Sequence, residues 1–501
     1  MPAVTDPAHP LPPLALGIDI GTSSVKALVC DARGRVVAEA SSLTPILTPP
    51  EVAPLGRAMD PPQVLRALRR VVRQVLSSCP PEAVAVVGLT SMRQGIALLD
   101  RDGREVYLGP NIDLRAVFEG AALDEEHGEA VYRITGHGPS FLLPWGRLVW
   151  LGTHRPEAYE RVAVLLPLAD WLAYRATGVQ AAEAALAGEA GLLDIRERRW
   201  AGALARTLGL RDDWFPPLAP ALSVRGRVTR EGSARLGVPP GVPVVVAGPD
   251  AHCALWAAGV RGAGQMGVVL GWSTPVHLLT PRPCPDPRRR TWVGLALEGD
   301  LWTAEANAGD GGHALSWVAR HLYGSGGRSW KRMGEEAARA GPGSGGVVGL
   351  LGPTALDLSR PGMRTGGWLL PIPLSYSGVG RGHLARAALE NIAFAVRACV
   401  ELLEEVGGEK GSPLHVAGGG LRLGLFPPLL AAALNRPVLA APHPSTSALG
   451  AALIGLKALN LLEGLPPPLA YTPDPGEALV YASGYATWRE AGERLSHLPR
   501  G

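Results

Sequence analysis

Near the beginning of the chain, apolar residues occur in two patterns: short continuous runs, which are typical of strands, and positions three or four residues apart, which are typical of a helix. Residues 14–30 contain two apolar runs separated by Gly-Thr-Ser-Ser at 21–24, a composition typical of a tight turn between strands. A third strand is expected over residues 35–40. Residues 61–78 place apolar side chains at helical spacing, and residues 83–89 form a continuous apolar run of the kind buried in parallel sheets. The pattern predicts a hairpin, a third strand, a helix and a buried strand.

The second half of the chain repeats parts of this pattern. Residues 244–250 form an apolar strand that ends in a carboxylate, as residues 14–19 do, and residues 267–279 read as strand, small-residue turn and strand. A long helix is expected over 382–406, followed by a strand at 414–417 and three glycines. Two similar halves predict a duplicated α/β core around a cleft.

This organisation predicts two domains. Residues 1–13 read as a disordered leader, 14–242 as the N-terminal domain and 243–490 as the C-terminal domain, with residues 131–215 as a helical insertion on the first core. Asp19 and Asp250 would then face each other from opposite walls of one polar cleft.

Composition narrows the possible functions. The chain has 501 residues, 47% of them hydrophobic and 19% charged, with a net charge of +3, which gives no support for a nucleic-acid-binding surface. The longest apolar stretch, 448–462, is interrupted by Lys457 and Asn460, so we expect a buried helix and no membrane segment. The five cysteines are scattered and contain no CxxC pair, which favours a cytoplasmic protein.

Two strand ends carry residues suited to phosphoryl transfer. Gly21 allows a ligand to approach the backbone, and the amides and hydroxyls of Thr22 and Ser23 can donate to phosphate oxygens, although Gly, Thr and Ser are also ordinary turn residues. Asp250 is a candidate general base, because transfer to a hydroxyl needs a carboxylate that takes its proton. Alternatively, Asp250 only caps the helix expected after it.

Another polar group follows the buried strand at 83–89. Arg93, Gln94 and Asp113 offer donors and acceptors suited to a polyhydroxylated ligand, and polar residues at the carboxyl ends of strands are where open α/β sheets bind ligands. The alternative is a solvated loop with an ion pair. The chain has no GxxxxGK[ST] motif and no GxGxxG opening a βαβ unit, which argues against a P-loop enzyme and a dinucleotide dehydrogenase.

Together these stretches resemble the FGGY carbohydrate kinases, which share the two-domain actin-like, ribonuclease-H-like ATPase fold. The resemblance covers roughly residues 14–490 and rests on residues 17–26, 91–95 with 111–115, Pro-Trp-Gly-Arg-Leu-Val-Trp-Leu at 144–151, Asp-Trp-Leu-Ala-Tyr at 170–174, Gly-Pro-Asp at 248–250, 383–390 and 417–420. Within the family, residues 91–95, 131–136 and 191–194 look most like the autoinducer-2 kinases, while xylulose and glycerol kinases are similar in the core.

The resemblance implies an ATP- and Mg²⁺-dependent kinase whose acceptor is a small sugar or polyol, with the autoinducer-2 precursor or a pentulose such as xylulose as the leading candidates. It implies Asp250 as general base, and substrate binding by Arg93, Gln94, Asp113 and Asp250. It implies ATP contacts from Asp19, Gly21, Thr22, Ser23, Gly271, Ser273, Thr274, Gly312, Ser316, Gly418 and Gly419. Asp19 and Asp250 would hold Mg²⁺ through water, and a homodimer is compatible with the resemblance.

The chain departs from the family pattern in places. Gln94 is a neutral amide where many relatives have Glu or His, and after Gly420 the usual small and polar residues are replaced by Leu-Arg-Leu-Gly at 421–424. Two alternatives therefore stay open at this point: an actin-like ATPase that needs no small substrate, and a catalytically silent sugar-binding regulator.

Overall fold

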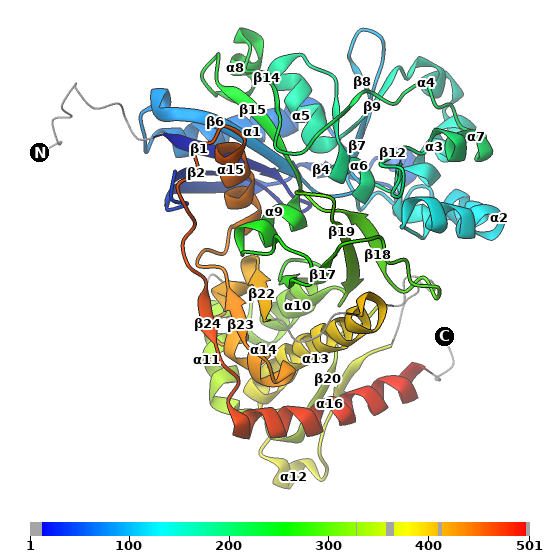
Figure 1. Ribbon diagram of the computed structural model, residues 1–501. Coiled ribbons are helices and arrows are strands. Elements are labelled where there is room, and N and C mark those ends of the chain that lie inside the picture. The colour runs from blue at the N-terminus through cyan, green and yellow to red at the C-terminus, as the bar shows by residue number, and fades with distance from the viewer. Residues whose placement is uncertain (1–12, 327, 357–364, 409–412, 497–501) are drawn as a thin grey trace, which may run out of the picture. The chain divides into compact units, whose positions relative to one another are not determined.

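The computed structural model describes residues 13–326, 328–356, 365–408 and 413–496, and its chain divides into two compact units (Figure 1). Unit 1 contains residues 1–135, 140–253 and 447–466, and unit 2 contains residues 136–139, 254–446 and 467–501. Apart from Pro13, the expected leader lies outside the described residues. Each unit is built around one mixed sheet, so the expected α/β class is confirmed.

The central sheet of unit 1 has six strands in the order β14-β15-β6-β1-β2-β3. The strands are β1 (Leu14–Ile20), β2 (Ser24–Asp31), β3 (Val36–Leu43), β6 (Val84–Ser91), β14 (Val224–Arg227) and β15 (Pro243–Pro249). β1, β2 and β3 form an antiparallel meander, whereas β1, β6 and β15 run parallel. The expected hairpin, third strand and buried strand are all present.

Helix α1 (Pro61–Leu76) shows why the local sequence folds as expected. Asp60 caps the helix by accepting a hydrogen bond from Gln63 N at 2.8 Å, and prolines occupy its first two positions, where no amide partner is needed. The buried face consists of Val64, Leu68, Val71, Val72, Val75 and Leu76. These apolar residues recur every three or four positions, so they form one stripe against the sheet.

The other elements of unit 1 surround this sheet or extend it. Its remaining helices are α2 (Val117–Thr135), α3 (Pro144–His154), α4 (Pro156–Arg161), α5 (Leu168–Thr177), α6 (Ala184–Glu189), α7 (Gly202–Thr207), α8 (Arg230–Leu236) and most of α15 (Thr446–Ala458). A second sheet has the order β8-β7-β9, formed by β7 (Ile96–Leu99), β8 (Glu105–Gly109) and β9 (Val164–Pro167). Short two-stranded pairs are β4 (Ile46–Leu47) with β5 (Ala58–Met59), β10 (Ala182–Glu183) with β13 (Leu218–Ala219), and β11 (Leu193–Asp194) with β12 (Arg199–Trp200).

Helix α15 packs directly on the backbone of β1 and β6. A Cβ atom on Gly17 would lie 1.9 Å from the carbonyl oxygen of Ala448, and one on Gly88 would lie 1.8 Å from that of Ala451. No side chain fits at either distance. The two glycines therefore let a helix formed by residues 446–458 close the core of a sheet whose first strand begins at residue 14.

The sheet of unit 2 has the order β18-β19-β17-β16-β22-β23-β24. Its strands are β16 (Met266–Val269), β17 (Pro275–Thr280), β18 (Trp292–Leu295), β19 (Trp302–Asn307), β22 (Leu414–Ala417), β23 (Val438–Ala440) and β24 (Leu469–Tyr471). The helices are the end of α9 (Asp250–Ala257), α10 (Gly311–Tyr323), α11 (Ser329–Ala340), α12 (Leu374–Ser377), α13 (Arg381–Gly407), α14 (Phe426–Leu434) and α16 (Pro475–Ser496), and β20 (Val348–Leu350) pairs with β21 (Gly367–Leu369).

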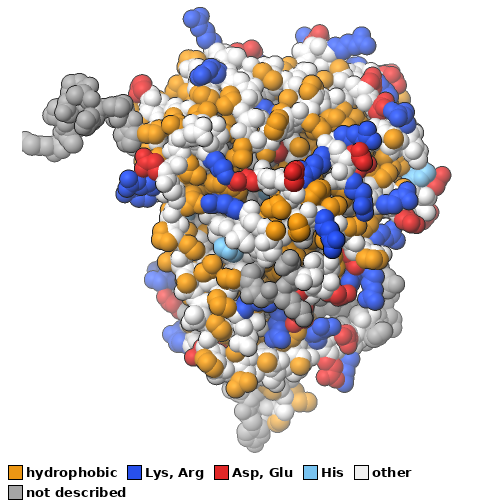
Figure 2. Space-filling view, in the orientation of Figure 1, with side chains coloured by type: hydrophobic (Ala, Val, Ile, Leu, Met, Phe, Trp, Pro, Cys, Tyr) orange, Lys and Arg blue, Asp and Glu red, His pale blue; other side chains and the backbone are white. Residues whose placement is uncertain are grey.

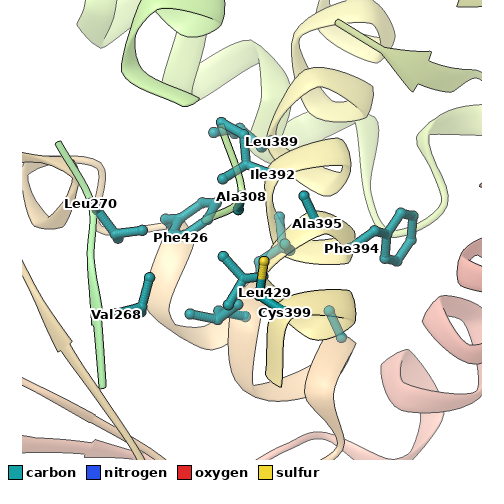
Figure 3. Packing of buried hydrophobic residues seen from close by; sticks show 14 of the residues in the cluster. Val268, Leu270, Ala308, Leu389, Ile392, Phe394, Ala395, Cys399, Phe426 and Leu429 are labelled. Atoms are coloured by element: carbon teal, nitrogen blue, oxygen red, sulfur yellow. The ribbon is translucent and has the colours of Figure 1, made fainter. Parts of the chain in front are cut away.

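Helix α13 forms the centre of the core of unit 2. Leu270, Ile392, Phe394 and Phe426 all belong to one buried cluster. Ile392 lies on the side of the helix that faces Leu270 and Phe426, and Phe394 points to the other side (Figure 3). There Phe394 meets the aromatic rings of α16, with Trp488 at a centroid distance of 6.0 Å. The long helix expected at 382–406 therefore packs on two sides, as its many buried positions require.

The two sheets share one strand arrangement, which confirms the duplicated core. In unit 1 the order β3-β2-β1-β6-β15 is two antiparallel neighbours followed by two parallel ones, and β19-β17-β16-β22-β23 repeats this in unit 2. The sixth strand is antiparallel in both, β14 beside β15 and β24 beside β23.

This arrangement corrects one part of the sequence interpretation. We expected residues 244–250 to open the second half, with Asp250 facing Asp19 from an opposite wall. β15 instead pairs with β6 inside the first sheet, so Asp250 and Asp19 belong to the same unit, and Figure 1 shows β15 beside strands from the beginning of the chain. The true counterpart of β1 is β16. The units consequently do not follow the division that we expected between residues 242 and 243.

Charged groups are mixed over the surface. On the face seen in Figure 2, Lys and Arg side chains are interspersed with Asp and Glu, in keeping with the small net charge of +3. Among the described residues, none of the helices combines the length and the apolar character that crossing a membrane requires.

Candidate active site

Three parallel strands of unit 1 end level with one another. Ile20 of β1 is the register partner of Ser91 of β6, and Ser91 is the partner of Pro249 of β15. The residues after these strands therefore share one edge of the sheet. This edge carries Asp19 with the loop at 21–24, Arg93 with Gln94, and Asp250, so the structure brings together most of the unit 1 residues that we singled out from sequence.

The loop after β1 is held by its own backbone and by neighbouring loops. Gly21 N donates to Ser24 O at 3.1 Å, and Thr44 Oγ1 donates to Gly21 O at 2.7 Å. The hydroxyl of Thr22 donates to Asn111 Oδ1 at 3.0 Å, which links this turn to the loop that precedes Asp113. The turn has the short, glycine-led form that we expected of a phosphate-binding hairpin.

Asp19 is a buried carboxylate whose charge is incompletely compensated. Burial raises the pKa of Asp19 to about 7; Lys26 opposes the rise and Asp250 adds to it. Lys26 is the register partner of Asp19 on β2. The oxygen Oδ1 is buried and accepts no hydrogen bond within the part of the chain that the structure describes. A buried acceptor atom of this kind suits a cation or an ordered water.

Asp250 is the first residue of α9. Its Oδ1 accepts a hydrogen bond from Ala251 N at 2.8 Å, so it does take part in starting the helix. Burial raises the pKa of the Asp250 carboxyl, Arg93 and the Ala251 amide oppose the rise, and Glu189 adds to it. A carboxylate with a raised pKa is a better proton acceptor, which is the property that a general base needs.

Arg93 and Gln94 are both fixed by Glu189, a residue that our sequence analysis missed. Arg93 Nη1 donates to Glu189 Oε2 at 2.9 Å, and Gln94 Nε2 donates to the Glu189 carbonyl oxygen at 2.7 Å. Gln94 has φ of 57°, in the left-handed region, and its own carbonyl accepts from Arg147. Since non-glycine residues seldom adopt this conformation, its contacts hold it there.

Asp113 lies in a separate network. Its Oδ1 accepts from the backbone amides of Arg57 at 2.7 Å and Arg115 at 3.3 Å. Its Oδ2 accepts from the Tyr107 hydroxyl at 2.5 Å and from Arg115 Nε at 2.6 Å. A carboxylate has about four acceptor positions. The chain itself fills them, so Asp113 orders its loop and forms an ion pair with Arg115, as in the alternative that the sequence left open, although Asp113 is buried there and not solvated.

In unit 2, the loop between β16 and β17 is packed against the first turn of α10. Gly312 N donates to Trp272 O at 3.1 Å, and a Cβ on Gly312 would lie 2.4 Å from Gly271 O. Thr274, in the same loop, is buried, and its carbonyl accepts from Ala308 N at 3.0 Å. Ser316 lies four residues after Gly312, one turn further along α10. The amides at the start of this helix offer the partial positive charge that binds phosphate groups.

The glycines after β22 approach the same loop. Gly418 has φ of 98°, and a Cβ there would lie 2.6 Å from Leu270 O, so a larger residue would be strained and would clash. Gly418 N donates to Thr446 Oγ1 at 2.9 Å. A Cβ on Gly419 would meet nothing within 4 Å, which leaves open space beside the backbone. The structure thus groups the predicted ATP residues of unit 2 at one sheet edge.

The sheet is duplicated, and each copy has a strand-turn-strand loop that can bind phosphate. These two features together define the class of actin-like ATPases and sugar kinases. The family description "FGGY family of carbohydrate kinases, N-terminal domain" matches residues 14–257, and the corresponding C-terminal domain matches residues 266–459. The chain therefore belongs to the FGGY family of carbohydrate kinases. It is a phosphotransferase with an alcohol group as acceptor, of a family that uses ATP as phosphate donor.

Individual relatives agree with this assignment. An autoinducer-2 kinase of Yersinia pseudotuberculosis serotype O:3 (strain YPIII) is 29% identical over 472 residues, which cover 90% of this chain and 87% of that protein. The xylulose kinase from Rhodospirillum rubrum superposes with a TM-score of 0.82 and 27% identity, over 96% of this chain and 99% of that one. Plasmodium falciparum glycerol kinase with ADP shares the fold, with a TM-score of 0.80 at 16% identity, over 98% of this chain and 99% of the other.

Proposed function

We propose that this protein transfers the γ-phosphoryl group of ATP to a hydroxyl of a small sugar or polyol, with Asp250 as the general base. The observation that carries the proposal is the position of Asp250 at the end of β15, level with Asp19 and Arg93 on one sheet edge. Asp250 Oδ1 is occupied by the Ala251 amide, and Oδ2 is the atom that would receive the proton of the attacking hydroxyl.

Asp19 and Asp250 are the residues that would hold Mg²⁺, through water. Two neighbouring carboxylates, one with a buried oxygen that lacks a hydrogen bond among the described residues, fit a cation that binds through one or two carboxylates, waters and phosphate oxygens. The metal would supply charge neutralisation on the phosphates. Gly21, Thr22 and Ser23 would place amide and hydroxyl donors beside the same phosphates.

The remaining ATP contacts would come from unit 2. Gly271, Ser273 and Thr274 form the second loop, where we propose donors to the phosphates, beside the amides that begin α10. Gly312, Ser316, Gly418 and Gly419 would line the adenosine side. The close backbone approach at Gly312 and the open space at Gly419 support these positions.

On the acceptor side, Arg93 and the Gln94 side-chain oxygen would bind substrate hydroxyls. Gln94 Nε2 is already used by Glu189 O, so Oε1 is the atom that would accept a hydrogen bond from the substrate. The substrate contact predicted for Asp113 stays a prediction, and its filled hydrogen bonds favour an indirect contribution through Tyr107 and Arg115. The names of the relatives lead us to propose the autoinducer-2 precursor or a pentulose such as xylulose as acceptor.

ADP release with a panel of pentuloses, polyols and the autoinducer-2 precursor tests the proposal. We expect ATP turnover that depends on one class of acceptor and that disappears in Asp250→Asn. Turnover without any acceptor would identify an actin-like ATPase. Sugar binding without turnover would identify a regulator. Either result would contradict the kinase proposal.

A further inference from the structure

Glu189 places a third carboxylate beside Asp250 and Arg93. It is the last residue of α6, and its side chain is 1% exposed. Besides the ion pair with Arg93, its Oε1 lies 3.7 Å from His252 Nε2. Arg93 and Asp250 are both close enough to Glu189 for its charge to act on them. No part of the phosphoryl transfer proposed above uses this carboxylate.

The position of Glu189 is fixed by two further buried carboxylates. Asp170 accepts the backbone amide of Glu183 at 3.0 and 3.1 Å. Glu183 in turn caps α6 by accepting Ala185 N at 2.9 Å and Leu186 N at 2.7 Å. The short helix that carries Glu189 is therefore anchored at its beginning, and the ion pair with Arg93 anchors its end.

Several charged side chains lie around Asp250. Arg93 carries the guanidinium that acts on Asp250, and Glu189 offsets that charge in a buried ion pair. Another buried arginine of this region, Arg147, directs its terminal nitrogens at the carbonyl oxygens of Pro110 and Gln94. The Arg93 guanidinium is already paired with Glu189. An acceptor that carries a carboxylate would therefore be repelled by the charges of Asp250 and Glu189, and such repulsion is costly in a poorly solvated site.

We propose that Glu189 makes the acceptor site select uncharged sugars and polyols over sugar acids, by neutralising Arg93. The inference rests on the proposed function and narrows its acceptor to neutral polyhydroxylated compounds. In the absence of Glu189, the Arg93 guanidinium would be available to form a charge-assisted pair with a substrate carboxylate. Glu189 is thus a specificity residue that acts through Arg93.

The test compares pentuloses and pentitols with pentonates of the same carbon number, by calorimetric binding without ATP and by ADP release with ATP. In the wild-type protein we expect at least tenfold weaker binding of the pentonates. In Glu189→Gln, which keeps a hydrogen-bond acceptor for Arg93, we expect pentonate binding to strengthen by about 10- to 100-fold relative to the neutral compounds, mainly as a lower KM.

Two control variants separate charge from folding. Glu105→Gln changes a part-buried Arg–Glu pair of the same unit, between Glu105 and Arg175, and is expected to leave the preference for neutral compounds unchanged. The double variant Arg93→Gln/Glu189→Gln removes both charges, and the gain in pentonate binding should disappear with them. This variant also covers the case in which an unpaired buried Arg93 prevents folding of the single variant.

Equal binding of pentonates and neutral compounds by the wild-type protein would overturn the inference. So would a folded Glu189→Gln protein that gains no pentonate affinity, or a gain that persists in the double variant. If no acceptor supports ADP release, the proposed kinase function fails, but the binding measurements still decide the role of Glu189.

Discussion

The sheets of the two units have the same strand arrangement but different residues at the strand ends. In unit 1, β1 ends at Asp19 and Ile20, and β15 is followed by Asp250; in unit 2, β16 is followed by Leu270 and Gly271. One copy of the scaffold therefore presents side-chain charge, and the other presents glycines and backbone amides. A single topology can supply acid-base chemistry on one copy and close backbone approach on the other, because the strand ends vary independently of the buried core.

The largest effect is expected in unit 1, whose strand ends carry charged side chains. Asp250→Asn removes the proposed base while keeping an oxygen that can accept from Ala251 N, so we expect kcat to fall by about 10³- to 10⁴-fold with the fold intact. Steady-state ADP release and circular dichroism of the same sample check this.

Asp60→Asn is the matched control, because Asp60 also starts a helix, accepts an amide hydrogen bond and lies in unit 1. It should leave kcat within about twofold and change stability by only about 0.5 kcal/mol or less, because Asn caps a helix about as well as Asp. If both variants lose activity equally, Asp250 acts only as a helix residue.

Asp19→Asn should separate activity from stability. The pKa of Asp19 is about 7 in the folded protein, compared with 3.8 for an ordinary aspartate. Between pH 3.8 and pH 7, the folded protein therefore keeps a proton on Asp19 that the unfolded chain has lost. Ionising Asp19 therefore costs stability as the pH rises through that window, and the cost is fully present above pH 7. The variant should be more stable by roughly 1 to 4 kcal/mol at pH 8, and should lose about 10² in kcat.

Urea unfolding at pH 4 and pH 8 measures the stability difference. The gain from Asp19→Asn should be small at pH 4, where the folded wild-type protein keeps Asp19 neutral. A gain of the same size at both pH values would show that the buried charge is not its cause.

In unit 2, whose strand ends present glycines and backbone amides, Gly418→Ala should be destabilising. It places a Cβ 2.6 Å from Leu270 O at a positive φ, so we expect a loss of about 2 to 3 kcal/mol and a higher KM for ATP. Thermal unfolding and ATP titration check this. Gly419→Ala, where a Cβ would meet no atom within 4 Å, should change stability by less than ~0.5 kcal/mol, and an equal loss there would contradict the packing argument.

A smaller effect is expected from the link between loops in unit 1. Thr22→Val removes the hydrogen bond to Asn111 Oδ1, which should cost about 0.5 to 1.5 kcal/mol of stability and raise KM severalfold. Chemical denaturation and ATP and acceptor titrations would measure both changes. An unchanged protein would show that the hydrogen bond is replaced by water.

Much of the fold could be predicted from local patterns, and strand pairing could not. The hairpin around residues 21–24, α1 and α13 follow from spacing and caps. The sequence pattern predicts that β15 opens the second half, because an apolar strand followed by Asp looks like β1. The pairing of β15 with β6 places it in the first sheet instead. The pairing of strands so far apart in sequence leaves no local signal.

The site was predictable where a motif carries the chemistry. Asp19 lies at the end of a strand, Arg93 and Asp250 come just after strands, and this placement makes all three candidate site residues. Glu189 was missed because it ends a short helix within an alanine-rich run, and only the fold brings it to Arg93. Its one sequence signal is a carboxylate isolated among small apolar residues, which in a buried helix requires a partner.

The most direct test of the account measures ADP and phosphorylated acceptor in the same reaction, by coupled assay and mass spectrometry. The strand ends of unit 1 are proposed to deliver the phosphoryl group to a sugar hydroxyl, so we predict one phosphorylated acceptor for every ADP. ADP formed without phosphorylated acceptor would contradict the account, because the same residues would then be directing the phosphoryl group to water.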